Sequence, residues 1–143
     1  MNSTSIKPKE AEFTNKMNNM LGAAIEALIN CCKTRNSLNP KDKCSLIGYA
    51  DNATKIFENI SISEIDRIKD YCFNKLRIDG GTYFINAFKK AKIILDNINR
   101  NEYIPIIILL TDGLYHDSNL TINYLKNEVS KFIILIIFFI YSL

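Results

Sequence analysis

The spacing of apolar residues changes along the chain from a helical to a strand-like period. Before Asn30, apolar positions recur at steps of three and four, which predicts one face of a long helix opening near Pro8. These positions are Phe13, Met17, Met20, Leu21, Ala24, Ile25, Leu28 and Ile29. Two short apolar segments, residues 44–50 and 54–57, then flank a polar turn, so we expect two adjacent strands there.

Two further helices are predicted by the same periodicity. Ser63, with Asp66 three residues later, resembles a capped helix start, and apolar residues follow at helical spacing up to a break at Gly80 and Gly81. A third helix starts just after Thr82 and runs to about residue 99. Its apolar face consists of Phe84, Phe88, Ala91, Ile94 and Leu95.

The remaining apolar segments predict an α/β fold. Residues 104–110 form an unbroken branched run that is typical of a strand covered on both faces, and the run ends at Thr111, Asp112 and Gly113. A fourth helical stretch follows, and residues 132–139 predict a last strand. The alternation indicates one domain over residues 1–143, an open, mostly parallel, doubly wound sheet with helices on both faces.

Composition narrows the class of protein. The chain has 143 residues, 48% hydrophobic and 23% charged, and its net charge of +3 is spread along the sequence without a basic run, so nucleic acid is not an expected partner. The four cysteines do not form a disulfide framework, so we expect reduced thiols. The first dozen residues have no apolar stretch typical of a secretory signal peptide, so we expect a cytoplasmic location. The apolar run at residues 132–143 is shorter than the roughly 20 residues of a membrane-spanning helix, which makes a membrane partner unexpected.

Candidate chemistry lies where predicted strands and loops place oxygen donors. Asp112 follows the most apolar strand, Thr82 precedes the third helix, and hydroxyls cluster at Ser3, Thr4 and Ser5. Carboxylate and hydroxyl oxygens favour Mg²⁺ or Mn²⁺ over zinc. Because His116 is the one histidine, the sequence argues against a catalytic Ser-His-Asp triad and against a histidine-based metal centre.

These residues, taken in order, resemble the metal-ion-dependent adhesion site of von Willebrand factor type A domains. That site combines an Asp-x-Ser-x-Ser segment, a Thr in a Gly-rich loop and an Asp at a strand end. The chain has Ser3-x-Ser5, Gly80-Gly81-Thr82 and Thr111-Asp112-Gly113. The resemblance implies that Ser3, Ser5, Thr82 and Asp112 bind Mg²⁺ or Mn²⁺, that a protein ligand offers a carboxylate to the ion, and that loops including Asp51 and residues 116–118 select this partner.

The chain also departs from the family pattern. Counting back from Ser5, Met1 stands where the family has its first Asp, and the family's central first strand has no counterpart. The resemblance therefore implies a truncated domain, a weak or absent metal site and two open sheet edges.

Three functions are compatible with these features of the sequence. The resemblance implies a protein-binding module with a degenerate or partial Mg-dependent adhesion site, without enzymatic activity. The alternative is a structural remnant or gene fragment that binds nothing. A Mg-dependent phosphoryl-transfer enzyme is the third possibility, but the sequence has neither a Gly-x-x-x-x-Gly-Lys-Ser/Thr loop nor a Gly-x-Gly-x-x-Gly motif.

Overall fold

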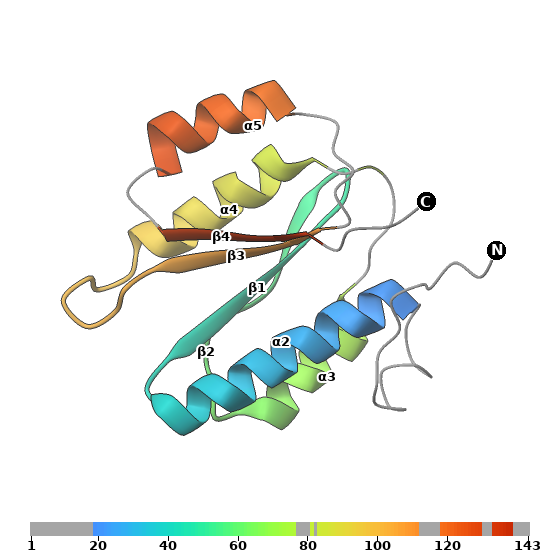
Figure 1. Cartoon of the computed structure of the whole chain (residues 1–143), viewed down its shortest axis with the longest axis vertical. Helices are drawn as coiled ribbons and strands as arrows, with labels where there is room; N and C mark the ends of the chain where they lie inside the picture. The colour runs from blue at the N-terminus through green and yellow to red at the C-terminus, as the bar shows by residue number, and fades with distance from the viewer. Residues whose placement is uncertain (1–18, 77–80, 82, 112–117, 130–132, 139–143) are drawn as a thin grey trace. The chain divides into compact units, whose positions relative to one another are not determined.

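The computed structural model describes residues 19–76, 81, 83–111, 118–129 and 133–138 (Figure 1). In chain order the elements are α2 (Asn19–Leu38), β1 (Lys43–Tyr49), β2 (Ala53–Ser61), α3 (Ile65–Lys75), α4 (Phe84–Asp96), β3 (Ile106–Thr111), α5 (Ser118–Tyr124), a π-helical turn (Leu125–Val129) and β4 (Ile133–Phe138). The described residues group into two compact units. The first contains residues 19–45 and 56–76, and the second contains residues 46–55 and the described residues from 81 to 138.

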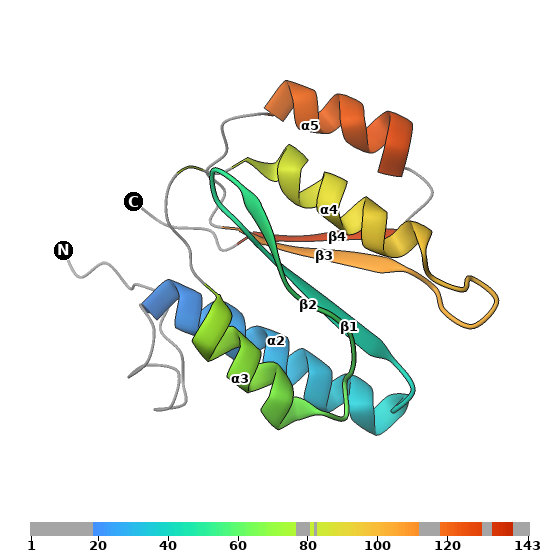
Figure 2. The same cartoon turned by 180° about the vertical axis from the view of Figure 1, so that it is seen from behind.

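In the first unit, α2 and α3 lie side by side (Figures 1 and 2). Ile25 and Ile29 are one helical turn apart on α2, and Ile68 and Cys72 are one turn apart on α3; all four are fully buried. The predicted apolar stripe of the first helix is therefore confirmed over its described part. The helix runs past Ile29 to Leu38, and its predicted start near Pro8 lies outside the described residues.

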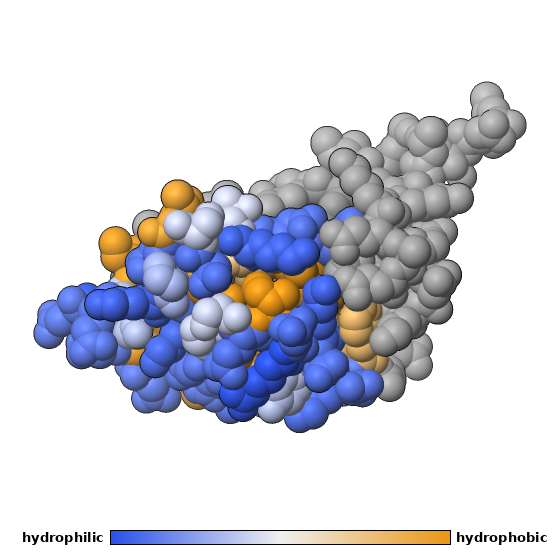
Figure 3. Space-filling model, turned by 90° about the horizontal axis from the view of Figure 1, so that it is seen from below, coloured by the Kyte–Doolittle hydropathy of each residue, from blue (hydrophilic) through white to orange (hydrophobic). Residues whose placement is uncertain are grey.

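Most polar positions of α2 are exposed, whereas Glu26 is buried at 8% exposure. Beyond Cys32, the residues from Lys33 to Arg35 are exposed. Among the coloured atoms of the face in Figure 3, hydrophilic residues predominate around a central hydrophobic strip. Exposed polar residues on α2 beside the buried Ile25 and Ile29 are the pattern that the spacing of residues predicts for a helix packed on one side.

Strands β1 and β2 form an antiparallel hairpin, as predicted, but β2 is longer than the predicted segment 54–57. It continues to Ser61 through Asn59, which has a φ of 53°. Asn tolerates this left-handed conformation better than most residues, and the Asn59 N–H donates to Ser45 Oγ at 3.0 Å. A side-chain hydroxyl of β1 thus supplies an acceptor where the irregular backbone of β2 needs one.

The second unit contains β3 and β4, which pair in parallel with Ile106 opposite Ile133 and Thr111 opposite Phe138. Helix α4 packs against β3, and α5 lies along α4 (Figures 1 and 2). One cluster of buried side chains joins α4 to β3 and another joins α4 to the π-helical turn. Their buried members are Phe84, Phe88 and Leu109, and Leu95 and Val129.

Two local predictions are wrong. The strand at β3 was expected to be covered on both faces, yet Ile106 and Ile108 are each 49% exposed, so in the structure one face of this strand is only half covered. The expected side-chain cap of α3 is also missing, because its N-cap residue is Glu64, without a side-chain capping bond. The Ser63 hydroxyl instead pairs with that of Ser61 at 2.7 Å.

The α/β class is confirmed, since helices and strands alternate through the described residues. Among these residues the strands form two separate two-stranded sheets, β1 with β2 and β3 with β4. Only the second of these is parallel within the described part of the chain. The larger doubly wound sheet therefore stays a prediction.

Candidate functional site

The described neighbours of Thr82 and Asp112 lie in the second unit, where the β1–β2 turn, the segment preceding α4 and the carboxyl end of β3 come together (Figure 1). Thr111 is the last residue of β3 and is 5% exposed. The carboxyl end of a parallel strand is the usual location of ligand sites in open α/β sheets. This part of the unit therefore contains the backbone that leads into the predicted ligand residues.

The β1–β2 turn holds the segment before α4 through two hydrogen bonds and α4 itself through a third. Asp51 accepts a bond from the Gly81 N–H at its Oδ1, 2.7 Å away. The Tyr83 N–H donates to the carbonyl of Ala50 at 3.2 Å, and the Asn86 side chain donates to the carbonyl of Asp51 at 3.3 Å. A bond from a backbone N–H to a charged carboxylate is among the stronger hydrogen bonds in proteins. The turn thus fixes the backbone on both sides of position 82.

Tyr49, the last residue of β1, connects the turn to β3. Its hydroxyl donates to the carbonyl oxygen of Leu110 at 2.6 Å. Its ring meets the ring of Phe84 edge-on, with centroids 5.6 Å apart and an interplanar angle of 77°, a favourable arrangement for an aromatic pair. One side chain therefore links the carboxyl end of β3 with the first turn of α4.

We expect Tyr49→Phe to lower the free energy of unfolding by about 1 kcal/mol, because it removes one hydrogen bond and leaves a part-buried carbonyl without that donor. A urea titration measures the change. Tyr124→Phe is the matched control, since the Tyr124 hydroxyl forms no hydrogen bond within the described part of the chain, and its loss should be smaller. Equal losses in the two variants would contradict the linking role of Tyr49.

All four predicted metal ligands, Ser3, Ser5, Thr82 and Asp112, lie outside the described residues. Their described neighbours are Gly81, Tyr83 and Thr111. Of the residues predicted to select the partner, Asp51 is described and is exposed in the turn, residues 116 and 117 lie outside the description, and Ser118 begins α5. The structure thus describes residues next to two of the predicted ligands and none of the ligands themselves.

The oxygen donors of Ser3, Ser5, Thr82 and Asp112 suit a hard cation such as Mg²⁺. Within the part of the chain that the structure describes, no group of three or more His, Cys, Asp and Glu side chains could hold a metal ion. The described residues therefore offer no competing metal centre. The nearest described carboxylate in the turn, Asp51, already binds the Gly81 N–H.

Sequence reasoning missed the supporting residues Tyr49 and Asn86. The only signal for Tyr49 was its position at the end of a predicted strand, and Asn86 was a polar residue in the first turn of a predicted helix. Their partners are 61 and 35 positions away in the chain, so no local pattern could have identified the contacts.

A family model described as von Willebrand factor type A domain matches residues 2–114. The match covers most of the chain and includes all four predicted ligand positions. The chain belongs to the von Willebrand factor type A family. A comparison with curated proteins gave no match.

Membership of this family indicates a general class of function. Domains of this family are interaction modules that bind other proteins, typically have no enzymatic activity, and often carry Mg²⁺ or Mn²⁺ at the adhesion site. A search of the described helices found none with the length and hydropathy needed to cross a membrane.

Proposed function

We propose that this chain is a protein-binding module that uses a partial adhesion site, in which Ser3, Ser5, Thr82 and Asp112 hold Mg²⁺ or Mn²⁺. When bound, the ion supplies an open coordination position for a carboxylate of the partner protein. The hydroxyl and carboxylate groups of the chain orient the ion, and the turn at Asp51 contributes to the choice of partner. The chain itself performs no catalytic step.

The observation that carries this proposal is the family match over residues 2–114, which encloses the three ligand segments in the family's order. The hydrogen bonds from the β1–β2 turn to Gly81 and Tyr83 support it. A metal ligand is useful only if its backbone is held in place, because a disordered ligand loses conformational entropy on binding.

We propose that the ion binds weakly. Met1 stands at the position of the family's first Asp and offers no carboxylate, so Asp112 is the one charged group in the set. Mg²⁺ is held by few protein groups and keeps several waters, and the affinity falls with the number of charged ligands. Binding of the partner's carboxylate then contributes a larger share of the total affinity.

We also propose a cytoplasmic location. All four cysteines, Cys31, Cys32, Cys44 and Cys72, are free in the structure, which is compatible with a reducing compartment.

The test of the metal site is a thermal melt with and without divalent ion. At about ten times the dissociation constant, binding to the native state adds about 1.4 kcal/mol and raises Tm by about 3 to 6 °C. We expect Asp112→Ala to abolish the rise. Asp70→Ala, which removes an exposed carboxylate of α3, is the matched control and should keep it.

Two results would contradict the metal site. No rise in the wild-type chain would favour the remnant without metal, and an equal rise in Asp112→Ala would place the ion elsewhere. Partner binding that persists in excess chelator would show that the chain binds its partner without the ion.

A further inference from the structure

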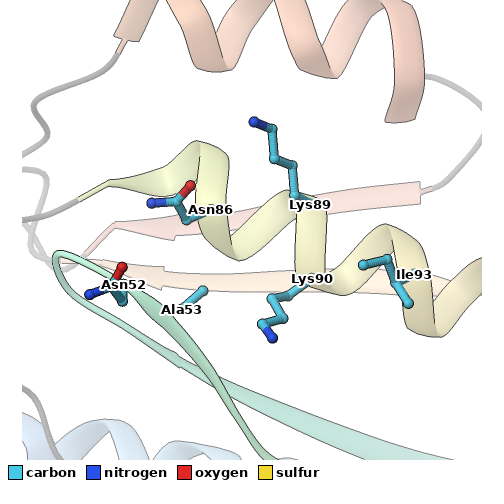
Figure 4. Close-up of a pocket in the computed structure, with 6 residues that line it drawn as sticks. All are labelled: Asn52, Ala53, Asn86, Lys89, Lys90 and Ile93. Atoms are coloured by element: carbon cyan, nitrogen blue, oxygen red, sulfur yellow. The ribbon is translucent and has the colours of Figure 1, made fainter.

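A hollow lies between the β1–β2 turn and α4 in the second unit (Figure 4). Its volume is about 300 Å³. The turn contributes Asn52 and Ala53 to its wall. Helix α4 contributes Asn86, Lys89, Lys90 and Ile93.

The wall on the side of α4 is one face of that helix. Asn86, Lys90 and Ile93 follow one another at steps of four and three, so they lie one above the other along the helix. Asn86 is fixed at the end nearest the turn by its bond to the carbonyl of Asp51. Figure 4 shows the Lys90 side chain extending toward the hairpin and Lys89 extending from the opposite side of the helix.

The hollow carries positive charge that the described residues do not neutralise. Lys89 and Lys90 are both exposed, and neither forms an ion pair within the described part of the chain. Lys92, on the same helix, differs because it pairs with Asp96 four residues later. The Lys90 ammonium group, which extends toward the hairpin, thus has no acidic partner among the described residues.

Apolar surface adjoins the two lysines. Ile93 is 64% exposed, although it belongs to a helix whose other large apolar residues, such as Phe88 and Ile94, are buried. Ala53 on the turn is half-buried. The hollow therefore combines ammonium groups and side-chain amides with an exposed aliphatic side chain.

We propose that this hollow binds an acidic segment of a partner protein, with a carboxylate at Lys90 and an apolar side chain on Ile93. The inference rests on the proposed protein-binding function and specifies the chemistry of the partner. It adds a contact that needs no metal ion, because the Lys90 ammonium group binds a carboxylate by charge alone.

The composition of the hollow favours a peptide over a nucleic acid. Nucleic-acid grooves follow a phosphate backbone with many basic residues and stack bases on aromatic rings. The hollow has two lysines and no aromatic residue in its wall, and Ile93 matches an aliphatic or aromatic side chain of a peptide.

The test is an NMR titration of the full chain in the presence of Mg²⁺ with a peptide of about twelve residues that alternates Glu and Leu. We expect amide shifts at residues 52–53 and 86–93. In Lys90→Glu the dissociation constant should rise about tenfold, because the change removes an attraction and adds a repulsion. Lys41→Glu makes the same change of charge at an exposed lysine outside the hollow and should leave the constant unaltered.

Three outcomes would overturn the proposal: shifts that fall outside the hollow, equal affinity of wild type and Lys90→Glu, or tighter binding of an oligothymidine than of the peptide. A peptide with Gln in place of Glu should bind more weakly, and salt should weaken the Glu peptide through screening. Repeating the titration in chelator separates the two proposals. Peptide binding that is lost in chelator but unaffected in Lys90→Glu supports the metal site alone. Peptide binding that persists in chelator but is weakened in Lys90→Glu supports the hollow alone.

Discussion

Replacing Phe88 with alanine is expected to lower the free energy of unfolding by about 3–5 kcal/mol, the usual cost of deleting a buried aromatic ring. Phe88 is 2% exposed and lies between Phe84 and Leu109. Partly buried side chains from β1, β3, α5 and the π-helical turn pack against this cluster, so their packing is lost along with the ring. These side chains are Tyr49, Ile107, Tyr124 and Leu125.

A urea titration followed by circular dichroism measures this effect. Phe88→Leu keeps most of the apolar volume and should cost less than the alanine variant. Ile93→Ala is the control on the same helix, because Ile93 is 64% exposed and a surface substitution usually changes stability by less than about 0.5 kcal/mol. A loss below about 1 kcal/mol in Phe88→Ala would show that the cluster does not stabilise the second unit.

The stability of the first unit is expected to fall as the pH rises from about 9 toward 12. Burial raises the pKa of the Cys72 thiol from 9.0 to about 12, with a further contribution from Cys32. Between these values the folded chain keeps the thiol proton and the unfolded chain has lost it. The unfolded chain then binds fewer protons, so the free energy of unfolding decreases as the pH rises through this range.

Urea titrations at several pH values between 8 and 11 measure this slope. Lysine and tyrosine side chains titrate in the same range, so the wild-type slope is compared with that of Cys72→Ala, or of Cys72→Val if the smaller side chain prevents folding. Removing the thiol should flatten the slope. Cys31→Ala removes an exposed thiol of α2 and should leave the slope nearly as steep. Identical slopes in wild type and Cys72→Ala would contradict the assignment to Cys72.

The periodicity of apolar residues predicted a helix or strand well where one face of that helix or strand is buried within its own unit. Helix α4 shows this, because the spacing of Phe84, Phe88 and Leu95 predicted both the helix and its buried side. The strands predicted at residues 104–110 and 132–139 were also found, as β3 and β4. The physical reason is that burial of an apolar stripe stabilises a helix or strand more than any local preference does.

The misses arose where a contact between distant residues overrode a local signal. The segment 54–57 was too short because β2 continues through Asn59, whose unusual backbone depends on a hydroxyl of β1. The bond from Gly81 to Asp51 joins residues 30 positions apart and could not be predicted from either segment. The sequence did place Asp51 among the residues around the site, but it gave no indication that the carboxylate supports a loop.

The parallel pairing of β3 and β4 has a consequence for biosynthesis. Ile106 pairs with Ile133, so each residue of β4 is synthesised 27 residues after its partner in β3. At about 5 to 20 residues per second, β3 spends roughly 1 to 5 seconds on the ribosome without its partner. During that interval the apolar residues of β3 are free to associate with other nascent chains. A lower growth temperature, or a chaperone that covers this segment, should therefore raise the yield of folded protein.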